Sequence, residues 1–412
     1  STNKLCAGAG GSVLVSSIVR SSALTIGTLA ALRQSWPYLS SFFVREDKSN
    51  FARVGSLRDW QIEANDSKAT LTVTMINKTS KHRTPALKFE KAGGMHCPGF
   101  LSHSRLHWLA RNCKLRAGDV VICTYPKCGT TWTEQIVLLL LNDGNPARLN
   151  PETKNTYTRD TGVGKIWPAA SIFDDKQYES MKATRPPHGE FALRLSPDEF
   201  DSVQGRRVIK QHMPRKHFQG QTSDGKLQPG VKVVYVTRNP LDACVSAYNH
   251  PGKSAPRKED RGVKGAPFPF SAYCKFYLDV GFAWGSWFAH NKGWRIECEK
   301  NPKQVLWVTY EGLHHDTEGE IKRIAEFLGL DVTKELLKNV ATHSTLSSMK
   351  KQAAARRSSA SGATDTHLKS GKIGKWRQFF TQEMYEDFLG VFNEEMKDFK
   401  SIRFDIGNGH IL

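Results

Sequence analysis

Short apolar runs alternate with amphipathic stretches along most of this chain. Residues 119–125 (DVVICTY) and 231–237 (VKVVYVT) are nearly unbroken runs rich in Val, Ile and Tyr, as is typical of buried strands. Residues 305–309 (VLWVT) predict a third strand, and a helical pattern follows at residues 320–328. Strands that alternate with helices favour a parallel sheet. We therefore expect residues 51–412 to form one α/β domain, with a central, mostly parallel sheet flanked by helices on both faces.

The first 50 residues differ in composition from the rest. No Asp or Glu occurs before Glu46, serine is frequent, and basic residues such as Arg20 and Arg33 are spread through the segment. This composition is typical of an organelle transit peptide, although an ordinary unstructured extension has the same features. We expect a cytoplasmic protein, with targeting to a plastid or mitochondrion through residues 1–50 as the alternative.

Two polar, basic stretches interrupt the alternation of strands and helices. They are residues 251–265 and residues 350–375. A helical pattern resumes at Trp376, which favours a mobile loop or lid for the second stretch rather than a linker between domains.

The charge of the chain indicates an anionic partner. Its 412 residues include 59 Lys and Arg against 40 Asp and Glu, a formal net charge of +19. Nucleic acid, an acidic membrane surface and a phosphorylated small molecule are all compatible with this charge, as is a solvated basic surface. Uncharged apolar stretches stay below the roughly 18 residues of a membrane span. The eight cysteines form no C-x-x-C pair, which favours a reducing compartment.

The segment 124–132 (TYPKCGTTW) has the features of a phosphate-binding turn. A buried strand leads directly into it, and a helical pattern begins at Thr130. Backbone N–H groups at such a turn converge on one anion, and Gly129 permits a close approach of the backbone. Lys127 adds a positive charge, and Thr131 adds a second hydroxyl beside that of Thr130. The Lys precedes the Gly, so the Walker pattern of ATP-binding enzymes is absent.

A second anion site is predicted where residues 231–237 end. Asn239 is suited to cap the following helix, and Pro240 is suited to its first turn. Ligands of open α/β sheets gather at the carboxyl ends of the strands. Arg238 and Ser246 could therefore reach one phosphate group.

Residues 207–214 (RVIKQHMP) form a further apolar strand pattern with Lys210 and His212 near its end. A lone histidine is more often structural than catalytic. Here it follows a strand in a chain with two predicted phosphate sites, which favours a catalytic role.

These segments resemble those of the soluble, cytosolic-type sulfotransferases that use 3′-phosphoadenosine 5′-phosphosulfate (PAPS). Residues 124–132 are similar to the family's 5′-phosphosulfate loop at every position except Cys128, where Ser is usual. Residues 207–214 resemble the strand that bears the catalytic histidine. Further similar segments are residues 233–248, which resemble the 3′-phosphate motif, residues 285–288 and 308–312, and the lid motif at residues 369–376.

The resemblance covers residues 100–390 and implies a single P-loop-type α/β domain. It implies that the 5′-phosphosulfate is held by Lys127, Cys128, Gly129, Thr130 and Thr131. Around the 3′-phosphate and the adenine it places Trp132, Arg238, Ser246, Tyr310, Ser344, Leu346, Lys369, Ser370 and Gly371. It makes His212 the general base, with Lys127 and Lys210 stabilising the transferring group.

Two motifs depart from the family pattern. In the lid, Lys369 replaces Arg and Ser370 replaces Lys, so one cation at the 3′-phosphate is lost. The dimer motif survives only in part, at Arg377, Thr381 and Glu386, which leaves both a monomer and a homodimer open.

The predicted activity is transfer of a sulfuryl group from PAPS to a hydroxyl or amine of a small molecule, with no metal and no nucleic-acid partner. The alternatives are a nucleotide kinase, which needs a Walker lysine, and a nucleic-acid-binding protein that uses the basic residues after Lys350. Phenols, alcohols, steroid-like molecules and amines all remain open as acceptors.

Overall fold

The computed structural model describes residues 56–68, 70–92, 95–98, 101, 103–149, 165–166, 196–218, 220–250, 268–357, 371–399 and 401–412. The predicted extension at residues 1–50, the whole predicted loop at 251–265 and two lid residues, Lys369 and Ser370, lie outside this set. The predictions made for them stay predictions.

Within the described residues, five parallel strands form the central sheet, which confirms the predicted α/β fold. Their order is β6-β7-β5-β8-β9, with β5 in the middle, between β7 and β8. Connections between parallel strands must cross over the sheet, and helices make those crossovers here. The strands are β5 (Val120–Thr124), β6 (Lys165–Ile166), β7 (Val208–Gln211), β8 (Lys232–Thr237) and β9 (Val305–Thr309).

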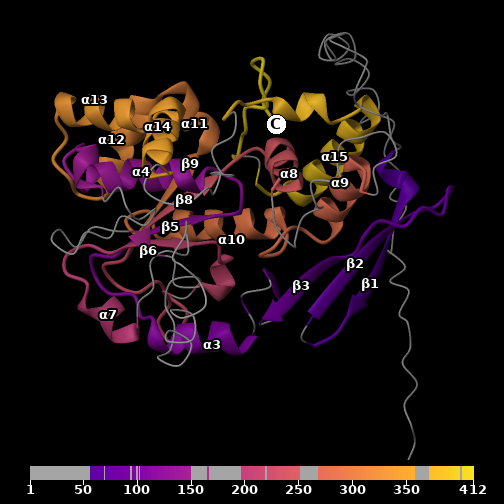
Figure 1. Cartoon of the computed structure of the whole chain (residues 1–412), viewed down its shortest axis with the longest axis horizontal. Helices are drawn as coiled ribbons and strands as arrows, with labels where there is room; N and C mark the ends of the chain where they lie inside the picture. Colours follow the sequence, from indigo (N-terminus) through magenta and orange to yellow (C-terminus); the bar gives the residue numbers. More distant parts are fainter. Residues whose placement is uncertain are drawn as a thin grey trace, which may run out of the picture.

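Successive strand residues point to opposite faces of this sheet, and each face has its own hydrophobic core. Val120 and Ile122 of β5 pack with α4 (Thr130–Leu140), α12 (Thr317–Phe327) and α13 (Lys334–His343). Val121 and Cys123 pack in the core of the opposite face, which includes α10 (Trp287–Lys300). Figure 1 shows α4, α12 and α13 grouped together, with α10 on the other side of the strands. The predicted helices on both faces are therefore present.

The helix boundaries follow the predicted signals closely. The side chain of Asn239 accepts a hydrogen bond from the backbone of Asp242 and caps α8 (Pro240–Tyr248), with Pro240 at its start. Further helices follow α8 in the sequence, among them α9 (Phe270–Asp279), α11 (Tyr310–His315) and α15 (Gln382–Glu395). Others precede β8, among them α3 (His103–Asn112) and α7 (Pro197–Ser202).

The prediction of a mobile loop at residues 350–375 was wrong for its first part. Helix α14 (Leu346–Arg357) includes residues 350–357. Lys, Gln, Ala and Arg, which make up this part of the sequence, are all strong helix formers. The helix is also anchored, because Gln352 Nε2 donates to the carbonyl oxygen of His343 at 3.1 Å and Met349 is buried.

An antiparallel sheet precedes the central sheet and was not predicted. Its strands pair in chain order, and Figure 1 shows β1–β3 beside α9. Trp60 Nε1 donates to Ser271 Oγ at 3.0 Å, and the rings of Phe89 and Phe276 stack with centroids 5.7 Å apart, so the sheet packs on α9. The strands are β1 (Trp60–Asp66), β2 (Thr70–Asn77), β3 (Leu87–Ala92) and β4 (Met95–Cys97).

No helix in the described residues is long and apolar enough to cross a membrane.

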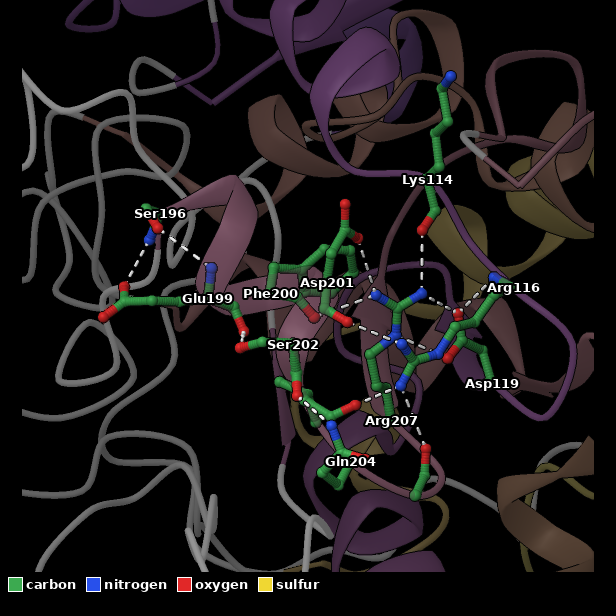
Figure 2. Close-up of polar contacts among 12 residues, drawn as sticks. Lys114, Arg116, Asp119, Ser196, Glu199, Phe200, Asp201, Ser202, Gln204 and Arg207 are labelled. Carbon is green, nitrogen blue, oxygen red and sulfur yellow. Dashed lines mark hydrogen bonds and ion pairs between the residues drawn. The ribbon is translucent and has the colours of Figure 1, made fainter.

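A fully buried ion pair joins the amino-terminal ends of β5 and β7 (Figure 2). Arg207 donates from Nε to Asp119 Oδ1 at 2.8 Å and from Nη2 to Asp119 Oδ2 at 2.6 Å. Its remaining N–H groups bind the carbonyl oxygens of Phe200 and Lys114 at 3.1 and 2.9 Å and approach Asp201 at 3.3 Å. The guanidinium also lies 4.0 Å from the centre of the Phe200 ring. The donors of this buried cation are therefore satisfied.

We expect Arg207→Ala to destabilise the protein by about 3–5 kcal/mol, because it leaves the Asp119 carboxylate buried without its partner. Urea denaturation followed by circular dichroism measures this change. Arg83→Ala removes an exposed ion pair with Glu63 and should leave the denaturation midpoint unchanged. Equal midpoints for Arg207→Ala and Arg83→Ala would contradict the role assigned to the buried pair.

Candidate active site

The turn between β5 and α4 has the geometry of an anion-binding loop. Lys127 and Gly129 both have left-handed backbone conformations, with φ of 73° and 105°. A Cβ atom on Gly129 would lie 2.7 Å from Cδ2 of Tyr310, so only glycine fits this position. Gly129 is also the N-cap residue of α4, and no side chain accepts a capping hydrogen bond from the first turn of this helix. The first N–H groups of this helix are thus available to a bound anion.

The other residues of the turn divide into polar and packing positions. Thr130 Oγ1 lies 2.7 Å from Thr124 Oγ1, and Thr131 is half-buried at the start of α4. Cys128 is fully buried, and this burial raises the pKa of its thiol to about 12. A protonated, buried thiol is an unreactive packing group. The Cys128 side chain therefore packs within the loop, its backbone N–H donates to the carbonyl oxygen of Tyr125 at 3.3 Å, and its predicted contact with the phosphosulfate stays a prediction.

Lys127 contacts a residue that the sequence did not single out. Its Nζ lies 3.2 Å from Nδ1 of His250, which follows α8. Both side chains are half-buried. No sequence motif marks His250, because the contact arises only from the folding of α8 against the turn.

His212 lies beside the phosphate-binding turn. Its Nδ1 is 2.9 Å from the carbonyl oxygen of Thr124, the last residue of β5. Because a carbonyl oxygen only accepts hydrogen bonds, Nδ1 carries the proton and Nε2 is the basic nitrogen of the neutral ring. The side chain is 8% exposed. The predicted base is thus held with a defined tautomer next to the turn.

Trp284 packs against His212 in a strained conformation. The two rings are 6.0 Å apart, and Trp284 has φ of 82°, which is rare for a large side chain. Its backbone N–H donates to the carbonyl oxygen of His96 in β4 at 2.7 Å. Such strain persists where surrounding contacts hold it, often at functional sites. The antiparallel sheet therefore helps to fix a wall of the site.

Lys210 is a buried residue of β7 and forms an ion pair with Glu134 of α4. Its Nζ lies 3.9 Å from Glu134 Oε1, and both side chains are at most 5% exposed. This pair anchors the lysine near the turn, and its predicted contact with the transferring group stays a prediction.

Arg238 and Tyr310 meet at the carboxyl ends of β8 and β9. The Arg238 guanidinium lies 4.3 Å from the centre of the Tyr310 ring. Its Nη2 donates to the carbonyl oxygen of Lys372 at 3.1 Å, but its Nε is buried and has no partner in the described part of the chain. A buried guanidinium with an unused donor is suited to an anion.

Two further aromatic rings pack with Tyr310. The rings of Trp132, Tyr310 and His314 form a cluster with centroid distances of 4.9 to 5.5 Å. His314 was missed in the sequence, although it lies one helical turn after Tyr310 and so shares its face of α11. Burial lowers the pKa of His314. A neutral aromatic cluster of this kind can stack a nucleobase.

The described part of the predicted lid motif, residues 371–376, is tied to the same cluster. Tyr310 Oη donates to the carbonyl oxygen of Gly371 at 2.7 Å, and Leu346 approaches Gly371 as well. Asp242 accepts hydrogen bonds from the backbone N–H groups of Gly374 and Trp376 at 2.8 and 2.9 Å. Residues 371–376 are thereby held against α8 and α11.

The remaining predicted positions are less informative. Ser344 is fully buried and follows α13, where its Oγ donates to the carbonyl oxygen of Ala341 at 3.4 Å. Ser246 is half-buried on α8, eight residues after Arg238. No cluster of three His, Cys, Asp or Glu side chains suited to a metal ion occurs among the residues that the structure describes.

Comparison with known proteins gives one consistent result. A sequence model described as "Sulfotransferase domain" matches residues 117–400. Sulfotransferase 2B1 of Mus musculus is 31% identical over 319 residues, which cover 76% of this chain and 80% of the relative. Sulfotransferase 2B1 of Homo sapiens is 30% identical over 304 residues, 72% of this chain and 71% of the relative.

Solved structures show the same fold. Mouse sulfotransferase SULT7A1 complexed with PAP has a TM-score of 0.51 at 22% identity and covers 76% of this chain and 95% of its own. Retinol dehydratase in complex with androsterone and inactive cofactor PAP has a TM-score of 0.54 at 21% identity. The match covers 78% of this chain and 91% of the retinol dehydratase chain. Because the sequence model matches most of the residues that build the site, the chain belongs to the sulfotransferase family and is an enzyme that transfers a sulfuryl group to a small-molecule acceptor.

Proposed function

We propose that this enzyme takes the sulfuryl group from PAPS and that His212 acts as the general base. The hydrogen bond from His212 Nδ1 to the carbonyl oxygen of Thr124 carries the proposal, because it joins the base to the phosphate-binding turn. The family relationship supplies the reaction class, and the geometry supports the roles proposed for the residues.

The donor would lie across the contacts already described. The N–H groups of the turn and Lys127 would bind its 5′-phosphosulfate. The unused Nε of Arg238 suits the 3′-phosphate, and the cluster of Trp132 and Tyr310 suits the adenine. Two related structures contain PAP, the nucleotide that remains after PAPS gives up its sulfuryl group, which supports this assignment.

Transfer would proceed by in-line displacement. The acceptor oxygen or nitrogen forms a bond to sulfur as the bond between sulfur and the bridging phosphate oxygen breaks, and PAP leaves with the bonding electron pair. His212 Nε2 takes the acceptor's proton. Negative charge grows on the bridging oxygen, where the positive charge of Lys127 would stabilise it. As in phosphoryl transfer, most of the rate comes from positioning and charge neutralisation.

Lys127→Ala should weaken PAP binding by at least about tenfold, because it removes the cation of the phosphate-binding turn. Isothermal titration calorimetry with PAP measures this effect. Lys226→Ala serves as the matched control, because its side chain is 81% exposed in a different loop. Similar PAP affinity in both variants would remove Lys127 from the donor site.

His212→Ala should lower turnover by about two to four orders of magnitude while PAP affinity stays close to that of the wild type. The reason is that the general base acts on the acceptor and not on the nucleotide. Steady-state rates with PAPS and a panel of phenol, alcohol and amine acceptors test this, with PAP titration on the same sample. Loss of PAP binding together with turnover would show that His212 is structural.

Asp242→Asn should weaken PAP binding by about tenfold, because an amide cannot accept hydrogen bonds at both atoms that now bind Gly374 and Trp376. Releasing residues 371–376 also frees the carbonyl partner of Arg238 at Lys372. Asp224→Asn, in an exposed turn, is the control. An unchanged dissociation constant for PAP in Asp242→Asn would argue against any coupling between this segment and the donor.

A further inference from the structure

Helix α10 presents two buried side chains to the backbone that follows β7. His290 Nε2 lies 3.2 Å from the carbonyl oxygen of His212, and Trp294 Nε1 donates to the carbonyl oxygen of Met213 at 3.0 Å. Strand β7 ends at Gln211, so these two carbonyl groups lie beyond its ladder. Buried carbonyl groups need hydrogen-bond partners, and one turn of α10 supplies both.

The tautomer of His290 follows from its two contacts. Its Nε2 must carry the proton, because the His212 carbonyl oxygen can only accept. Its Nδ1 must then accept, and the hydroxyl of Tyr235 lies 2.8 Å away. The same hydroxyl also hydrogen-bonds Asn291 Oδ1 at 3.1 Å, an oxygen that accepts from Thr237 as well; its contact with Nδ1 is the shorter of the two. Burial lowers the pKa of His290 to about 3, so the ring is neutral.

A polar side chain at this position has a cost that packing alone does not explain. His290 is completely buried, with Tyr125 packed edge-on against its ring and Tyr235 stacked on it. An apolar ring could fill such a space without the desolvation penalty of an imidazole. The imidazole differs from it only in its two hydrogen bonds, and one of them ends on the residue assigned as the base.

We propose that His290 is a positioning residue for His212. It holds the main chain of His212 so that Nε2 of His212 keeps a constant direction toward the acceptor. This inference rests on the proposed role of His212 as general base. His212 is then fixed at two points, at its carbonyl oxygen by His290 and at Nδ1 by the carbonyl oxygen of Thr124. Misplacing a catalytic group by about 1 Å can lower a rate by about 100-fold.

The test compares His290→Phe with His290→Gln. Phe keeps the ring and removes both hydrogen bonds, whereas Gln restores a donor and an acceptor. We expect kcat to fall about 10- to 100-fold in His290→Phe and to recover largely in His290→Gln, with the dissociation constant of PAP unchanged in both. Trp294→Phe is the control for packing, and its kcat should fall less than that of His290→Phe.

Nitrogen-15 NMR of the histidine side chains gives a readout that a purely structural role would not move. In the wild type His212 should be protonated at Nδ1, and in His290→Phe it should show a mixture of both tautomers. Wild-type kcat in a folded His290→Phe variant would overturn the proposal. If that variant does not fold, Tyr235→Phe decides, because it removes the hydrogen bond to Nδ1 of His290, together with the one to Asn291 Oδ1, and leaves the His290 ring in place. Unchanged kcat and unchanged tautomers in Tyr235→Phe would also overturn the proposal.

His212→Ala separates the two proposals. Retained turnover in His212→Ala would reject the general base itself. An inactive His212→Ala together with fully active His290 variants would reject only the positioning role of His290.

Discussion

The buried ion pair between Arg207 and Asp119 fixes how β5 and β7 lie side by side, and the site depends on that register. The two strands are parallel, with Val120 opposite Val208 and Cys123 opposite Gln211. Continued by one residue, this register brings Thr124 level with His212, and the observed hydrogen bond joins these two residues. A slip of one residue would turn His212 to the other face of the sheet. A charge pair at one end of the strands thus determines whether the base reaches the turn at the other end.

The residues of the site are far apart in the sequence but lie in the same region of the fold. Phosphate-binding turn, base, buried arginine and tyrosine all follow the carboxyl ends of neighbouring parallel strands, β5, β7, β8 and β9. The supporting contacts come from farther away: α10 binds the backbone after β7, and residues 371–376 close over α8 and α11. The order of the strands therefore determines which side chains lie close together, and the helices and residues 371–376 hold these side chains in position.

Local features of the sequence predicted the local parts of this structure well. The strand at residues 305–309, the turn at Gly129 and the cap at Asn239 each depend on neighbouring residues, and each agrees with the structure. The antiparallel sheet was not predicted, although Leu71, Val73 and Met75 alternate with polar residues as in a half-buried strand, because this segment lacks the unbroken apolar run that marks the strands of the central sheet. The contact of Lys127 with His250 and the burial of Cys128 could not be predicted, since both arise from packing between distant segments.

The hydrogen bond from Trp284 to His96 bears on where the functional unit begins. The family match starts at residue 117, but His96 belongs to β4 and holds the backbone of the residue whose ring packs on His212. The antiparallel sheet also buries Trp60 and Phe89 against α9, a helix of the catalytic domain. The sheet is thus an integral part of the enzyme. A fragment cut at the start of the family match would keep every motif and lose the support of one wall of its active site.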